Sequence, residues 1–284
     1  MIRVEQLCKS YGDVDALRSI SFEVPPGQVC GYVGPNGAGK TTTVRILAGL
    51  LRPSAGRASV AGFDVGEDRL EAKRRIGYVC ETGAVYSTLT VSEYLALVGA
   101  LHHMEQADVA ARCDRMLRLF GIDDAADRRL GTLSKGMRQK VVISAALLHD
   151  PDVLLLDEPL SGLDANATVV IKQLVRGLAE RGKAVLYCSH VLDVVERVCD
   201  RVVILDQGEV VADGPTAELI ASARNSTLES LVRSLTGTDD SQAMAEDLLD
   251  VVSLDRFEQP ADPIDDSASQ TASGKRIAGK GDDA

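Results

Sequence analysis

The chain has 284 residues, 45% of them hydrophobic, and a formal net charge of −11, so it can bury the core of one large domain with or without appendages. Its six scattered cysteines form no CxxC pair, which argues against a disulfide framework and favours a reducing cytoplasm. No run approaches the ~18 apolar residues of a membrane span, so any membrane role must come through a partner.

The predicted elements alternate between strands and helices along the chain. Residues 2–11 and 19–24 alternate like half-buried strands, and 25–27 form a turn. An apolar strand at 28–34 leads through a glycine loop into a helix over 40–51, which "RPSAG" ends. Further short apolar strands are predicted at 76–80, 153–159 and 183–190. This alternation predicts a mainly parallel sheet covered by helices on both faces.

Two segments depart from this alternation. Residues from about 90 to 149 carry helical patterns and no convincing strand, which predicts a helical lobe inserted in the sheet domain. Residues 238–284 hold twelve acidic and four basic residues, a net charge of −8, and end in "SASQTASGKRIAGKGDDA". That composition predicts an acidic, disordered tail. The remaining net charge of −3 offers no basic face for nucleic acid.

The glycine loop is the most specific motif. Residues 34–41, "GPNGAGKT", fit G-x-x-x-x-G-K-[ST] between a strand and a helix. Glycines let successive N–H groups point at a phosphate, Lys40 supplies a mobile charge for the outer phosphates, and the Thr41 hydroxyl can bind Mg²⁺. The alternative is an ordinary glycine-rich turn. The candidate nucleotide-binding residues are Gly34, Pro35, Asn36, Gly37, Ala38, Gly39, Lys40, Thr41 and Thr42.

Two acids follow the apolar strand "VLLLDEP" at its carboxyl end, where the glycine loop also lies. Asp157 can hold Mg²⁺ through water, and Glu158 can accept a proton from an attacking water or orient it. The alternative is a solvated acidic turn.

A second anion site is predicted at "LSKGMRQK", Leu133–Lys140, where a serine, a glycine and three cations open a helix. Cys188, His190 and Cys199 could be zinc ligands, but they lack a fourth ligand at the usual spacing, so a zinc site is not expected.

From Ile2 to Gly237 the sequence resembles the ATP-binding cassette (ABC) ATPases. Tyr11 stands where that family places an aromatic residue on adenine, and "LSKGMRQK" stands where it has its signature sequence. Ser161–Asp164, "SGLD", resembles the loop between two ATP sites. His190, after the last core strand, resembles the switch histidine that senses the γ-phosphate. Taken singly, Tyr11 is an ordinary strand-end residue and His190 an ordinary capping residue.

The resemblance implies an α/β P-loop NTPase fold: a RecA-like, mainly parallel sheet, an antiparallel β subdomain and an inserted helical subdomain. It implies ATP and Mg²⁺ as ligands and a second cassette as partner, giving a homodimer. Ser134 and the N–H groups near Gly136 would hold the γ-phosphate of ATP bound to the other cassette. This would explain why one chain has two anion sites.

Two departures from the usual family motifs indicate which branch of the ABC ATPases the sequence resembles. Lys135 and Met137 replace a glycine and a glutamine of the usual signature, and Glu81 replaces a glutamine, although a carboxylate can still bind Mg²⁺. Both departures resemble the branch that partners ABC-2-type membrane proteins, mostly exporters of drugs, lipids or polysaccharides. Thr227–Gly237 resembles the closing helix of that branch, and is equally compatible with an amphipathic capping helix.

The predicted function is therefore the ATPase subunit of an ABC-type exporter. It would lie in the cytoplasm, on the inner face of the cell membrane, and power a separate ABC-2-type permease that docks on the helical lobe, with the Glu81 loop as the coupling element. Nucleic acid is not an expected partner. The alternatives are an ABC ATPase acting on nucleic acid or ribosomes, and a nucleotide-binding regulator without turnover.

Overall fold

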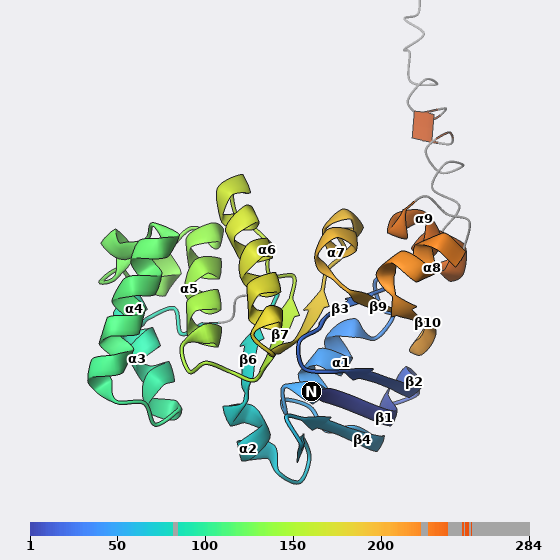
Figure 1. The fold of residues 1–284 in the computed structure, drawn as a ribbon, viewed down its shortest axis with the longest axis horizontal. Coiled ribbons are helices and arrows are strands. Elements are labelled where there is room, and N and C mark those ends of the chain that lie inside the picture. The colour runs from blue at the N-terminus through green and yellow to red at the C-terminus, as the bar shows by residue number, and fades with distance from the viewer. Residues whose placement is uncertain (82–84, 223–226, 238–245, 247, 250, 252–284) are drawn as a thin grey trace, which may run out of the picture. The chain divides into compact units, whose positions relative to one another are not determined.

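A computed structural model describes residues 1–81, 85–222, 227–237, 246, 248–249 and 251 (Figure 1). The chain divides into two compact units, Met1–Asp239 and Asp240–Ala284. The first unit carries the sheets and helices described below. The predicted tail lies almost wholly outside the described residues, so its boundary and its disorder stay predictions. Within the part of the chain that is described, no helix is both long and apolar enough to cross a membrane.

An antiparallel sheet is built from the N-terminal part of the chain. Its strands are β1 (Ile2–Tyr11), β2 (Val14–Val24), β4 (Ala55–Val60) and β5 (Phe63–Asp64), in the order β2-β1-β4-β5. The predicted strand at 2–11 is confirmed, and the one at 19–24 is the end of a longer strand. Strands β4 and β5 were not predicted, because β4 begins at Ala55 within "RPSAG", whose proline and glycine indicate a turn.

The larger sheet has six strands in the order β10-β9-β3-β8-β7-β6. The strands β3 (Val29–Val33), β6 (Ile76–Val79), β7 (Val153–Asp157), β8 (Ala184–Cys188) and β9 (Arg201–Asp206) are parallel, and β10 (Glu209–Pro215) pairs antiparallel with β9. The predicted mainly parallel sheet is confirmed. The expectation that β8 is the last core strand is wrong, because β9 follows it in the chain and pairs with β3.

The parallel strands are buried on both faces, which is why they are continuous apolar runs. In β8, Leu186 belongs to the core shared with the antiparallel sheet, and its neighbours Val185 and Tyr187 belong to the core on the opposite face. Helix α1 (Lys40–Leu47) contributes to the first core, and α6 (Ala165–Glu180) and α7 (Leu192–Val198) contribute to the second (Figure 1). Helix α1 ends before the predicted residue 51, since Gly49 turns to a left-handed conformation with φ 63°.

The predicted helical lobe is confirmed over its described residues. It holds α3 (Val91–Leu101), α4 (Gln106–Phe120), two 3₁₀ turns (Asp123–Ala125 and Leu130–Thr132) and α5 (Lys135–Leu147). Thr90 and Glu93 form a capping box that starts α3, and Gly121 ends α4 at φ 63°. Helix α5 joins the lobe to the sheet, because Val141 packs in the lobe core and Val142 in the sheet core.

Three shorter helices complete the first unit. They are α2 (Arg69–Arg74), α8 (Thr216–Ser222) and α9 (Leu228–Thr236). The predicted closing helix corresponds to α9. Thr227 caps its start, Gly237 follows its end at φ 66°, and Leu228, Leu231 and Val232 bury its apolar face.

Candidate functional site

The glycine loop between β3 and α1 passes close to its neighbours. Gly34 has φ 152°, and a Cβ there would lie 2.1 Å from the Leu205 carbonyl oxygen. Gly39 has φ 107°, and a Cβ there would lie 2.6 Å from the Ala16 carbonyl oxygen. Both positions therefore need glycine for their backbone angles and for the space. The loop therefore packs closely against both β9 and β2.

Helix α1 begins with an uncovered N-terminus. Its N-cap is Gly39, so no side chain accepts from the first N–H groups, and these have no partner within the helix. Lys40 begins the helix, and its Nζ donates to the carbonyl oxygens of Gly34 at 2.6 Å and Pro35 at 2.9 Å. Partial burial lowers the pKa of Lys40, against the opposing effect of nearby carboxylates. The start of α1 thus combines three features that attract an anion: free N–H groups, the positive end of the helix dipole and the Lys40 ammonium.

Asp157 ends β7 and is 4% exposed. Its pKa is raised to about 6, first by desolvation and then by the neighbouring carboxylates of Glu81 and Glu158, while Lys40 opposes the shift. The carboxylates of Glu81 and Glu158 are thus close enough to raise the pKa of Asp157, and the Lys40 ammonium only partly offsets this effect. A cation placed among them would relieve this repulsion.

Glu158 has an uncommon backbone conformation for a residue with a side chain. Its φ is 51°, in the left-handed region, and its N–H donates to the Cys188 carbonyl oxygen at 3.0 Å. Its Oε1 accepts from the backbone N–H of His190 at 2.8 Å, and its Oε2 accepts from the Ser189 hydroxyl at 3.1 Å. The turn therefore aims the carboxylate at the loop that leaves β8.

His190 lies in that loop, and its side chain is 75% exposed. Its Nδ1 lies 2.8 Å from Glu158 Oε1, so the structure brings together both predicted catalytic residues. Although β8 is not the last strand of the core, it lies between β3 and β7. This central position is what sets His190 beside the residues at the carboxyl ends of those two strands.

One cavity, of about 220 Å³, gathers most of the predicted site. Its lining combines the glycine loop, the start of α1, the acidic strand end, Glu81 and the loop after β8. The lining residues are Ala16, Asn36, Gly37, Gly39, Lys40, Thr41, Thr42, Glu81, Asp157, Glu158 and His190. We call it the phosphate pocket.

Six predicted ligand-binding residues do not line the phosphate pocket. Gly34, Pro35 and Ala38 belong to the glycine loop itself, whereas Tyr11, Ser134 and Gly136 lie outside that loop. Tyr11, at the end of β1, is 48% exposed, and the Lys9 ammonium lies 5.2 Å from its ring centre. Ser134 and Gly136 lie at the start of α5, where the Ser134 hydroxyl caps the helix by accepting from the Met137 N–H at 3.2 Å. Their roles stay predictions.

The start of α5 is nevertheless attached to the segment that follows Glu158. A Cβ on Gly136 would lie 2.4 Å from the Gly162 carbonyl oxygen, so the two backbones touch. The buried Gln139 amide donates to the Pro159 carbonyl oxygen at 3.0 Å. Gly162 and Gln139 lie in the predicted motifs 161–164 and 133–140, and Ser189 precedes the predicted His190. Their contacts could not be predicted, because each partner is distant in the chain.

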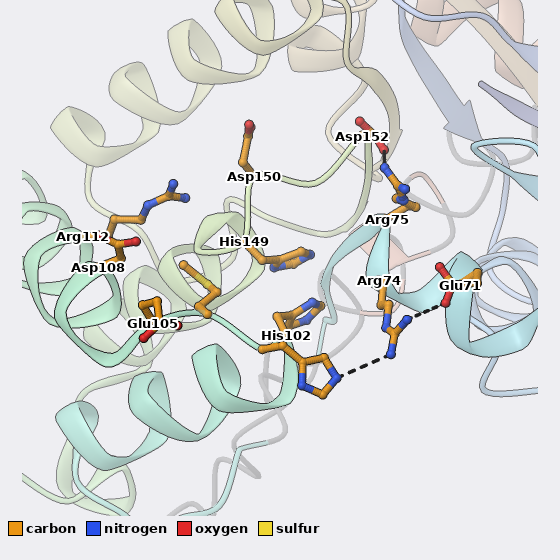
Figure 2. Close-up of a pocket in the computed structure, with 12 residues that line it drawn as sticks. Glu71, Arg74, Arg75, His102, Glu105, Asp108, Arg112, His149, Asp150 and Asp152 are labelled. Atoms are coloured by element: carbon orange, nitrogen blue, oxygen red, sulfur yellow. Dashed lines mark hydrogen bonds and ion pairs between the residues drawn. The ribbon is translucent and has the colours of Figure 1, made fainter.

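A second, larger cleft of about 650 Å³ lies away from the phosphate pocket (Figure 2). Lobe residues His102 and Glu105 line one side, and the core residues Arg75 and Asp152 line another. The rings of His102 and His149 stack with centroids 3.6 Å apart. The cleft therefore lies where the helical lobe meets the core.

The residues of the phosphate pocket fit a nucleoside triphosphate with a divalent cation. No protein atom lies within 4 Å of a Cβ built on Gly37, so a phosphate can approach the backbone there, and the first N–H groups of α1 have no side-chain cap. The Thr41 hydroxyl and the carboxylates of Asp157 and Glu81 are oxygen ligands of the kind that Mg²⁺ prefers.

Comparison with known proteins agrees with this chemistry. Residues 17–161 match the family model described as ABC transporter. The ABC transporter ATP-binding protein NatA of Bacillus subtilis is 40% identical over 217 residues, covering 76% of this chain and 88% of that protein. The daunorubicin/doxorubicin resistance ATP-binding protein DrrA of Streptomyces peucetius is 39% identical over 227 residues, covering 80% and 69%.

Solved structures agree with the same assignment. A structure described as the ATP-binding subunit of an ABC transporter superposes with a TM-score of 0.79 at 31% identity, covering 83% of this chain and 99% of that one. A dimeric post-hydrolysis state of the ATP-binding cassette MJ0796, bound to ADP and Pi, superposes with a TM-score of 0.71 at 26% identity, covering 76% and 99%. These matches establish the P-loop NTPase fold.

Proposed function

This chain belongs to the ABC transporter family of ATPases, and we propose that it is the ATP-hydrolysing subunit of an exporter whose permease is a separate, ABC-2-type membrane protein. The observation that carries the proposal is the phosphate pocket, where the glycine loop, three carboxylates and His190 converge. The export direction is supported by relatives such as the drug-resistance protein DrrA.

We assign the residues of the phosphate pocket as follows. The N–H groups of the glycine loop and Lys40 bind the phosphates of ATP, and Tyr11 stacks on adenine. Thr41, Asp157 and Glu81 would hold Mg²⁺, which would neutralise charge at the phosphates when bound. Glu158 orients the attacking water and accepts its proton, and His190, fixed against Glu158, contacts the γ-phosphate.

We further propose that the working unit is a dimer in which α5 of one chain completes the pocket of the other. Ser134 and Gly136 do not line the phosphate pocket of their own chain, and the cassette MJ0796 forms a dimer with ADP and Pi. The N-terminus of α5, which follows the N-cap Ser134, is suited to bind an anion. Residues of the two chains would then share each γ-phosphate.

The shared site can be tested by complementation between two damaged chains. Ser134→Asp keeps a helix cap but adds a negative charge, whereas Ser134→Asn keeps the cap without the charge and is the matched control. Lys40→Ala and Ser134→Asp chains should each be inactive alone. Mixed dimers, purified through two different tags, should regain up to one active site each. Inactive mixed dimers whose formation has been verified would refute the shared site.

The permease is proposed to dock at the cleft between lobe and core. This cleft borders the start of β6: His149 Nε2 lies 3.0 Å from the Ile76 carbonyl oxygen, and Arg75 pairs with Asp152 at 3.1 Å. Strand β6 then runs to Val79, two residues before Glu81 in the phosphate pocket. A permease segment seated in the cleft would therefore contact the strand that leads to a proposed Mg²⁺ ligand.

Crosslinking tests this docking site. A photo-crosslinking residue at Glu105, in the cleft, should capture an integral membrane protein in native membranes. The same residue at the exposed Glu209 of β10 is the control. Capture of ribosomal protein or nucleic acid, with no membrane protein, would refute the exporter assignment.

A further inference from the structure

Ser189 is a buried hydroxyl that the reaction scheme above does not use. It is 3% exposed, and it lies in the loop between β8 and α7. Its oxygen accepts from the Val191 N–H at 3.2 Å and lies 3.1 Å from Glu158 Oε2. An ionised carboxylate can only accept, so the single proton of the Ser189 hydroxyl is donated to Glu158. We propose that Ser189 is a positioning residue for Glu158, a role that rests on the proposed function of Glu158 in hydrolysis.

The geometry explains why this one hydroxyl matters. His190 contacts only Oε1 of Glu158, through its backbone N–H and its Nδ1, both at 2.8 Å. Among the described residues, Ser189 makes the only hydrogen bond to Oε2. If only Oε1 is hydrogen-bonded, the carboxylate can still rotate about the bond between Cγ and Cδ. Hydrogen bonds to both oxygens fix the orientation of the carboxylate plane. Since Ser189 is buried, water is poorly placed to replace the lost donor.

The end of β8 also holds the backbone of Glu158 in its uncommon left-handed conformation. The residue is held at φ 51° by the bond from its N–H to the Cys188 carbonyl oxygen. Cys188 ends β8, and Ser189 follows it directly. The backbone and the side chain of Glu158 are thus both fixed by the same three consecutive residues, 188–190, so the end of β8 sets the orientation of the base.

The first test compares variants of Ser189 in steady-state ATP hydrolysis. Ser189→Ala should lower kcat about tenfold, equivalent to about 1.4 kcal/mol, and leave KM for ATP within about twofold, because Ser189 does not line the phosphate pocket. Ser189→Thr keeps the hydroxyl and should recover most of the rate. Ser144→Ala is the matched control: it removes another fully buried hydroxyl, which donates to the Lys140 carbonyl oxygen at 2.9 Å, and it should not change kcat.

A double-mutant cycle separates positioning from a general structural effect. If Ser189 acts through Glu158, Ser189→Ala should change the residual rate of a Glu158→Gln enzyme less than twofold. A tenfold fall in both backgrounds would overturn the proposal, as would a Ser189→Ala enzyme with normal kcat. A Glu158→Gln enzyme with the wild-type rate would instead refute the role of Glu158 itself. Thermal melting of all variants shows whether a loss of rate comes from unfolding.

Discussion

The raised pKa of Asp157 makes a quantitative prediction about stability. Folding raises the pKa of this carboxyl to about 6, from 3.8 for the free side chain. The folded state therefore binds more protons than the unfolded state between these two values, so this residue lowers stability as pH rises through that window. A difference of about 2 units corresponds to about 3 kcal/mol at pH 7. Asp157→Asn removes this penalty.

The assay is urea unfolding of the wild type and of Asp157→Asn from pH 4.5 to pH 7.5, without nucleotide or divalent cations. The stability of the variant minus that of the wild type should rise by about 2 kcal/mol over this range and then level off. Any effect of the substitution on the free energy of unfolding that does not depend on pH cancels, because only the change of this difference with pH is compared. Asp206→Asn, at the end of β9 and outside the phosphate pocket, controls for the loss of any strand-end carboxylate. A difference that does not change with pH would refute the reasoning.

Four other changes have defined outcomes. Lys40→Ala should weaken ATP binding at least tenfold by nucleotide titration, since it removes the ammonium that faces the phosphates. Removing residues 238–284 should leave ATPase activity and melting temperature nearly unchanged, because that segment has little to bury. Burial lowers the pKa of His149 to about 4, so stability should fall as pH drops from about 6.5 towards 4, and His149→Gln should reduce that loss in acid unfolding. Gly136→Ala should lower stability by about 1–3 kcal/mol in urea unfolding, because its Cβ would meet the Gly162 carbonyl.

Local sequence patterns predicted the parts of the fold that depend on local physics. The apolar runs of β3, β7 and β8 have few alternatives once they are too short for helices and are flanked by turn residues. The glycine loop could also be predicted from the sequence, because the spacing of its glycines and lysine is specific to a phosphate-binding loop. Strands β9 and β10 were not predicted, although residues 202–205 of β9 form an apolar run like that of β7. Strand β10 alternates exposed and half-buried residues, and only its pairing with β9 identifies it as part of the sheet.

Within the site, the residue types were predictable and their supports were not. Lys40, Thr41, Asp157 and Glu158 follow from the chemistry that phosphate and Mg²⁺ require. Nothing local indicates that Ser189 would donate to a carboxylate 31 residues away. The parallel pairing of β7 with β8 brings Ser189 beside Glu158.

The pair Gly136 and Gly162 shows how this limit affects the interpretation of mutants. From the sequence, Gly136 had one explanation, a backbone N–H offered to a phosphate of the opposite chain. The structure adds an explanation within the chain, since any Cβ would approach the Gly162 carbonyl to 2.4 Å. Loss of activity after substitution of Gly136 therefore does not identify a phosphate contact. Ser134 does allow that distinction, because it is exposed, and an asparagine there preserves the cap while an aspartate adds only charge.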